Sequence, residues 1–277
     1  MAVTTLLFQN SSTSIAIESK KASEVATDPL VRCITPGIAF KNTVEIRKPF
    51  RVLYQTPGEP LDPGYIGKAE FVNASVEKIL VGGQPVIALV ATYTALEDNS
   101  RIGGQVVVLA FFRMHGRKPS LIDAVDISTD RFCGFSTEPV LHYKNGTDAV
   151  VVENSHFNSS ENFCILTPVA LVDGRLISLC NEVPILYNAK GARISMVEQG
   201  RLVVGVAPGL QPKPLSMSIR VICKTFDEND GDKVLSTHRK TFTIPFKLHG
   251  KTYSVNSKGK ELAALNDFVK KNGFDTP

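Results

Sequence analysis

The sequence predicts an all-β fold: an antiparallel sandwich or jelly-roll-like core that carries a short C-terminal amphipathic helix. Apolar, β-branched runs such as residues 86–94 and 105–114 have the length and composition of buried strands. Asn-Gly and Asp-Gly pairs separate many of these runs, and such pairs are typical of tight hairpin turns. Short strands joined by frequent turns favour an antiparallel sandwich or barrel over a parallel sheet.

The expected strands follow one another closely along the chain. Residues 86–94 and 105–114 flank a polar connection that bends through Asp98, Asn99, Gly103 and Gly104, so we expect them to be neighbours in a well-buried sheet. The expected strands are residues 65–80, 86–94, 105–114, 120–126, 148–153, 163–172, 175–179, 201–206, 215–226 and 241–248.

One segment near the C-terminus has the pattern of an amphipathic helix. Within KELAALNDFVKKNGF an acidic residue lies in the first turn, basic residues lie in the last, and Gly273 follows as a stop signal. The apolar residues fall on one face, and we expect this face to dock on the sheet. They are Leu262, Leu265, Phe268 and Val269.

Composition divides the chain into three parts. Residues 1–54 are expected to form a weakly ordered N-terminal segment, because they contain Ser/Thr-rich stretches and one short apolar patch at residues 34–40. A Pro/Gly-rich passage at residues 55–64 then leads into the β core domain, residues 55–256. The C-terminal helix and tail occupy residues 257–277.

The cysteines, the first residues and the longest uncharged stretch all bear on the cellular compartment of the protein. Five cysteines lie far apart without a C-x-x-C pair, which argues against a disulfide scaffold or zinc module and favours a reducing compartment. The first residues lack the pattern of a secretory signal, although an earlier removal of such a signal stays open. The longest uncharged stretch, residues 79–96, is interrupted by Gly82 and Gly83, which favours a turn between strands over a membrane helix. Peripheral membrane contact stays open.

Positive charge is concentrated toward the C-terminus. The net charge is +4, and residues 213–277 carry 12 Lys/Arg against 7 Asp/Glu. Residues 233–260 contain no acidic residue and interleave cations with aromatic residues, a mixture that suits single-stranded nucleic acid. The alternative is a half-buried strand with a basic solvent face, because Phe242, Ile244 and Phe246 alternate with polar residues. The candidate nucleic-acid-binding residues are Lys233, Arg239, Lys240, Phe242, Lys247, Lys251, Tyr253, Lys258 and Lys260.

The sequence carries no recognisable catalytic or metal-binding motif, so we expect a non-enzymatic protein without a cofactor. It lacks a phosphate-binding loop, H-E-x-x-H and G-x-S-x-G. Ser155 and His156 could in principle pair with Asp148 or Asp173 as a hydrolase triad, but a polar loop with a surface histidine is the commoner arrangement. Residues 227–232 partly resemble a calcium loop, but their spacing fits a charged hairpin turn better.

Three segments resemble, in the same order, the thirty-kilodalton superfamily of plant-virus movement proteins, most closely those of tobamoviruses. The first is DNSRIGGQVVVLAFFRM at residues 98–114, and the second is GLQPKPLSMSIRVICKTF at residues 209–226. The third is the charged segment that precedes the C-terminal amphipathic helix. One position departs from the family: Phe111 stands where its Leu-x-Asp-x-Arg phrase places an Asp, and the Asp173-Gly174 pair of a later similar phrase is better explained as a hairpin turn.

The resemblance implies a jelly-roll-like core and a protein that binds single-stranded RNA and carries a viral genome between plant cells. It also implies a location at plasmodesmata and in cytoplasm associated with the endoplasmic reticulum. The implied partners are single-stranded RNA, endoplasmic reticulum or plasmodesmal membrane, plasmodesmal host proteins and further copies of the chain. Two alternatives stay open: a secreted or periplasmic bacterial β-sandwich that binds a protein or glycan, and a capsid-type jelly-roll subunit.

Overall fold

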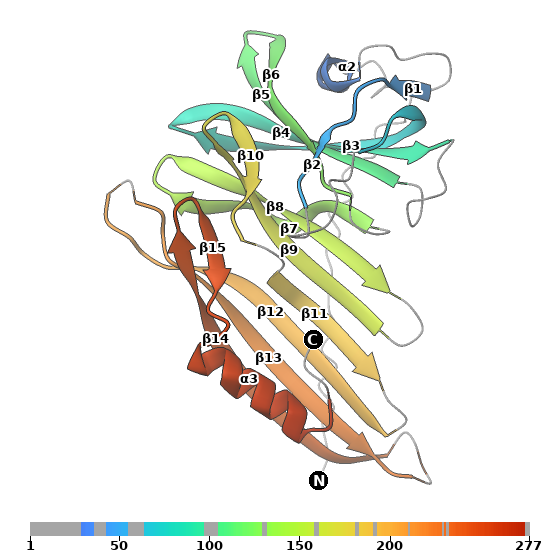
Figure 1. Cartoon of the computed structure of the whole chain (residues 1–277), viewed down its shortest axis with the longest axis vertical. Coiled ribbons are helices and arrows are strands. Elements are labelled where there is room, and N and C mark those ends of the chain that lie inside the picture. Colours follow the sequence, from blue (N-terminus) through green and yellow to red (C-terminus); the bar gives the residue numbers. More distant parts are fainter. Residues whose placement is uncertain are drawn as a thin grey trace, which may run out of the picture.

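The computed structural model describes residues 29–35, 43–54, 64–96, 105–128, 132–157, 161–180, 183–190, 193–209, 211–228, 230 and 233–274, and structural statements below refer to these residues. The described chain is built mainly of strands in two sheets, with short helices on their faces (Figure 1). The predicted all-β sandwich with a C-terminal helix is therefore confirmed.

The first sheet has six strands in the order β1-β3-β4-β5-β6-β2. Its neighbours are antiparallel except β2 and β6, which run parallel at one edge. The strands are β1 (Thr43–Ile46), β2 (Arg51–Val52), β3 (Gly67–Val81), β4 (Gln84–Ala95), β5 (Gln105–His115) and β6 (Lys118–Asp126).

The second sheet has nine strands in the order β15-β14-β13-β12-β11-β9-β8-β7, with β10 beside one end of β9. Its strands are β7 (Phe132–Lys144), β8 (Thr147–Phe157), β9 (Glu161–Val172), β10 (Arg175–Ser178), β11 (Val183–Lys190), β12 (Ile194–Val204), β13 (Leu215–Phe226), β14 (Val234–His249) and β15 (Thr252–Val255). The sheet curls enough for Lys213, just before β13, to donate its N–H to the Tyr143 carbonyl on β7 (2.6 Å).

Strands β4 and β5 are apolar along their length because both of their faces are buried. Tyr93 and Phe112 point to the outer face, where they pack with α2 (Pro29–Ile34) and β1. Val90 and Phe111 point to the inner face, where they pack against β8, β9 and β10 of the second sheet. This packing explains the two continuous β-branched runs, and β4 pairs with β5 as predicted. The predicted bend at residues 97–104 lies outside the described residues.

The C-terminal helix, α3 (Lys260–Lys271), covers one face of the second sheet, as predicted (Figure 1). Leu265 and Val269 are buried against that sheet, and the Phe268 ring meets the Phe242 ring of β14 edge-on at 5.7 Å between centroids. An edge-to-face aromatic pair of this kind adds roughly 0.5–1.5 kcal/mol beyond the burial of its surface.

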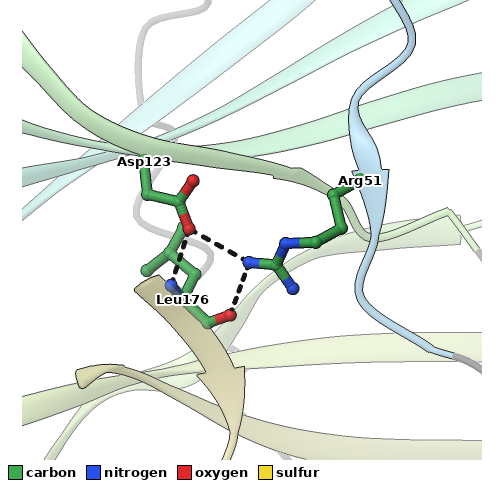
Figure 2. Close-up of polar contacts among 3 residues, drawn as sticks. All are labelled: Arg51, Asp123 and Leu176. Carbon is green, nitrogen blue, oxygen red and sulfur yellow. Dashed lines mark hydrogen bonds and ion pairs between the residues drawn. The ribbon is translucent and has the colours of Figure 1, made fainter. Parts of the chain in front are cut away.

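Polar contacts join the two sheets at β10, as Figure 2 shows. Arg51 Nη2 on β2 donates to Asp123 Oδ2 on β6 (3.0 Å) and to the Leu176 carbonyl on β10 (2.8 Å). The Leu176 N–H donates to the same Asp123 oxygen (2.7 Å). Strand β10 pairs with β9 on one side. On the other side of β10, the side chains of Arg51 and Asp123 make the hydrogen bonds to Leu176 that a neighbouring strand would otherwise make. We call the three residues the β10 latch.

Most expected turns and strands are found, and several strands were missed. Asp173 and Gly174 adopt left-handed φ angles of 51° and 76° between β9 and β10, which confirms the predicted Asp-Gly hairpin turn. Gly82 and Gly83 form the turn expected within residues 79–96, between β3 and β4. The five strands without a predicted counterpart are β1, β2, β7, β11 and β15.

The predicted N-terminal boundary needs correction. Residues 29–35 and 43–54 were expected to belong to a weakly ordered segment, but they contribute α2, β1 and β2 to the fold. Val31, Val44 and Ile46 are buried because they cover the outer face of β3, β4 and β5. Residues 1–28 and 36–42 of that segment lie outside the described residues. No helix in the described part of the chain is long and apolar enough to cross a membrane.

Candidate nucleic-acid interface

The predicted basic window, residues 233–260, spans β14, β15 and the first residue of α3. All seven of its cationic side chains lie on residues that are exposed to solvent. They are Lys233, Arg239, Lys240, Lys247, Lys251, Lys258 and Lys260. The structure spreads them over several surfaces, so they do not form one patch.

The two predicted stacking residues are not available to bases. Phe242 is 6% exposed and packs against Phe268 of α3. Tyr253 is 4% exposed, and its hydroxyl donates to the Lys213 carbonyl (2.7 Å). Both rings are part of the hydrophobic core that fills the concave side of the second sheet. The stacking role predicted for these residues is therefore wrong in this fold, because neither ring presents a free face.

Four cations of the window have contacts that reduce their attraction for phosphate. Lys233 pairs with Asp227 (3.2 Å), Lys251 pairs with Asp173, and Lys260 lies 4.0 Å from Glu261. Lys240 lies over the Phe242 ring at 5.0 Å from its centroid. The three ion pairs are surface contacts, which are individually weak and screened by salt.

Strand pairing brings further cations together on the face of β12, β13 and β14 that lies opposite α3. Phe242, Ile244 and Phe246 of β14 are buried on the α3 side, so Arg239 and Lys247 project to the other side. Arg201 of β12 and Arg220 and Lys224 of β13 share that side, because paired residues in antiparallel strands point to the same face. We call these five residues the basic face.

Four members of the basic face follow one another in a zigzag along the sheet, from β13 to β14, back to β13 and on to β12. The order is Lys224, Arg239, Arg220 and Arg201, and each step moves one strand across and two residues along the sheet. With ordinary strand spacing and rise, successive Cα atoms lie about 8 Å apart. The intervening residues include Thr237, Thr241, Thr243, Ser218 and Gln199 and no acidic residue. Sequence analysis missed Arg201, Arg220 and Lys224, because their position beside Arg239 depends on a strand register that it did not predict.

The structure describes part of the candidate hydrolase triad. The buried Asp148 carboxylate accepts the Leu80 N–H (2.8 Å) and contacts His142 Nδ1 (2.6 Å). Ser155 faces Cys164 on β9, and the side chain of His156 lies outside the described residues.

Among the described residues, no group of three or more His, Cys, Asp or Glu side chains could hold a metal ion. The predicted turn near residue 230 does connect β13 with β14, although residues 229, 231 and 232 are not described.

All five cysteines are free thiols. Burial raises the pKa of Cys164 and of Cys180 to about 12, and it also raises the pKa of Cys133 and Cys223. These four thiols therefore stay protonated at neutral pH, and a protonated thiol is a poor nucleophile.

Comparison of the chain with protein-family models, with curated proteins and with solved structures returns no match.

Proposed function

We propose that this protein binds single-stranded RNA through the basic face and, as its resemblance to plant-virus movement proteins implies, carries a viral genome between plant cells. The observation that supports the proposal most is a sheet face with five cations and no acidic residue on its described positions. Cations in such an arrangement attract the sugar-phosphate chain, whereas acidic neighbours would repel it.

The chemistry of this face suits phosphate contact without base readout. Arginine forms two parallel hydrogen bonds with a phosphate, and three of the four cations in the zigzag are arginines. The hydroxyl groups of Thr241 and Thr243 are further donors to phosphate oxygens. Because Phe242 and Tyr253 are buried, they add no base stacking, and affinity rests mainly on the release of counterions.

Salt dependence tests the proposal quantitatively. Four phosphate contacts on a single strand give a slope of about −3 in a plot of log affinity against log salt concentration. We expect replacement of Arg201, Arg220, Lys224 and Arg239 by Gln to weaken binding to unstructured RNA and to bring the slope close to zero. Fluorescence anisotropy with a labelled oligonucleotide measures both quantities over a series of salt concentrations.

Two matched variants separate the basic face from net charge alone. Replacing the exposed cations Lys78, Arg113 and Lys118 of the first sheet and Arg117 of its β5–β6 turn by Gln changes the charge equally, and we expect nearly unchanged RNA affinity. Replacing Lys233, Lys251, Lys258 and Lys260 tests the cations of the predicted window. Wild-type protein that does not bind unstructured RNA in dilute buffer would contradict the proposed function. Equal loss in all three variants would contradict only its assignment to the basic face.

Transport between cells is tested separately. A fluorescent fusion expressed in leaf epidermis is expected to form puncta at plasmodesmata and to spread into adjacent cells. The basic-face variant should lose its ability to move RNA while it keeps the fold. A diffuse signal confined to the expressing cell would contradict the transport part of the proposal. The free thiols also favour this proposal over the secreted alternative, which expects mostly paired cysteines.

A further inference from the structure

Strand β14 has a long edge that no other described strand covers. It pairs with β13 along most of its length, whereas β15 pairs only with Phe246, Lys247, Leu248 and His249. Residues 234–245 are therefore open on one side, and most of their side chains are exposed. The open edge of a strand carries backbone N–H and C=O groups that can pair with another extended chain.

The charge on this edge limits what can pair with it. Arg239 projects on the basic face and Lys240 projects on the α3 side, so an incoming strand meets positive charge on both faces. No Asp or Glu occurs between residues 233 and 260. The edge also contains the β-branched residues Thr237, Thr241 and Thr243, which favour an extended backbone.

A second copy of the same chain is a poor occupant. Antiparallel pairing of two β14 edges about a two-fold axis near Arg239 would place the Arg239 and Lys240 side chains of both copies close together. Like charges opposite each other in a sheet destabilise the pairing, and natural proteins use charged side chains on edges to prevent self-association. An acidic strand turns the same charges into cross-strand attractions.

We propose that the open edge of β14 binds an extended acidic segment of a partner protein by β-strand addition. Main-chain hydrogen bonds to residues 234–244 supply the affinity, and Asp or Glu side chains facing Arg239 and Lys240 supply the specificity. Pro245 ends this binding edge because it has no N–H to donate. This proposal does not require RNA binding, because its affinity comes from main-chain groups at the edge, although Arg239 belongs to both surfaces.

Binding of designed peptides to the full chain tests the proposal. The probe is a labelled eight-residue peptide that alternates glutamate with threonine or valine, measured by fluorescence anisotropy. One comparison peptide carries lysine in place of glutamate, and another keeps glutamate but has N-methyl groups on alternate amides. We expect the unmodified acidic peptide to bind at least tenfold more tightly than either. Equal affinity for the N-methylated peptide would overturn the proposal, because that result requires only ionic attraction.

Variants of the protein provide the second part of the test. Arg239→Glu combined with Lys240→Glu should reverse the preference, so that the lysine peptide binds more tightly than the glutamate peptide. Arg117→Glu combined with Lys118→Glu makes the same charge change in the first sheet and should leave the preference as it was. Hydrogen exchange on the wild-type complex should show new protection of amides within residues 234–244. Protection confined to other strands would overturn the assignment to this edge.

Discussion

Glu198 on β12 carries a buried carboxyl group, and burial disfavours its charged form. It is 8% exposed, and burial raises its pKa above the ordinary value of 4.5. The folded protein therefore holds this proton to higher pH than the unfolded chain does. The contribution to stability is most favourable below pH 4.5 and is lost as the pH rises through the raised pKa of the folded state.

We expect Glu198→Gln to raise the melting temperature at neutral and alkaline pH, because the amide carries no charge that must be desolvated. The gain should shrink as the pH falls below 4.5, where Glu198 is protonated in both the folded and the unfolded state. Thermal unfolding between pH 4 and pH 8, followed by circular dichroism, measures the effect. The exposed Glu138→Gln is the control, and a gain at Glu198 that does not depend on pH would contradict this explanation.

At the scale of single residues, sequence patterns predicted burial better than they predicted binding. The alternation of Phe242, Ile244 and Phe246 with polar residues indicated a half-buried strand, and all three side chains are buried. The aromatic residues of the window were also assigned to base stacking, but the core of a β protein requires the same residues. Sequence alone does not separate these roles, since an aromatic ring that stacks and one that packs have the same chemistry.

At the scale of elements, strands with continuous apolar or alternating patterns were predicted and irregular ones were missed. Strand β13 was predicted with the bounds that it has in the structure. Strand β7 contains Gly134 and Pro139, and its register against β8 shifts twice, so it lacks a clean alternation. Strand β11 contains Pro184 next to a register shift, and β15 has four residues. Such strands are stabilised by their neighbours more than by their own sequence.

The β10 latch gives an element-scale prediction. Asp123→Ala should lower the free energy of unfolding by about 1–3 kcal/mol, because it leaves the Leu176 N–H without its acceptor. The partly exposed Arg51–Asp123 contact should add a coupling energy of roughly 0.5–1 kcal/mol in a double-mutant cycle with Arg51→Ala. Urea unfolding of the four proteins of the cycle measures both values. The more exposed Arg47–Glu45 pair is the control, and equal coupling there would contradict a special role for the latch.

At the scale of the whole molecule, the candidate nucleic-acid interface depends on how strands of the second sheet pair with one another. The zigzag from Lys224 to Arg201 exists only because β12, β13 and β14 pair in one particular register. A shift by one residue would move the cations of a strand to the opposite face. The sequence predicted an all-β protein with a positively charged C-terminal region. Neither prediction specifies the register in which these three strands pair. Binding surfaces built across several strands are therefore harder to predict than linear motifs.

The packing between the sheets leads to a prediction about the whole molecule. Phe111 of β5 is fully buried between the two sheets, against residues of β8, β9 and β10. Phe111→Ala should lower the free energy of unfolding by about 3–5 kcal/mol, because it leaves a cavity at this interface. Since the same core supports both sheets, we expect one cooperative transition in the wild type and in the variant. Hydrogen exchange should become faster in the six-stranded and the nine-stranded sheet together.

Val76→Ala on β3 is the control for that experiment, because Val76 is 52% exposed and its truncation should change stability by only about 0.5 kcal/mol or less. Loss of protection confined to the six-stranded sheet, or two separate unfolding transitions, would mean that the sheets fold independently. In that event the β10 latch and the core around Phe111 would join two autonomous units. A single transition would instead make the basic face sensitive to core mutations in the six-stranded sheet. RNA affinity and stability should then fall together in the Phe111 variant as the temperature approaches its melting point.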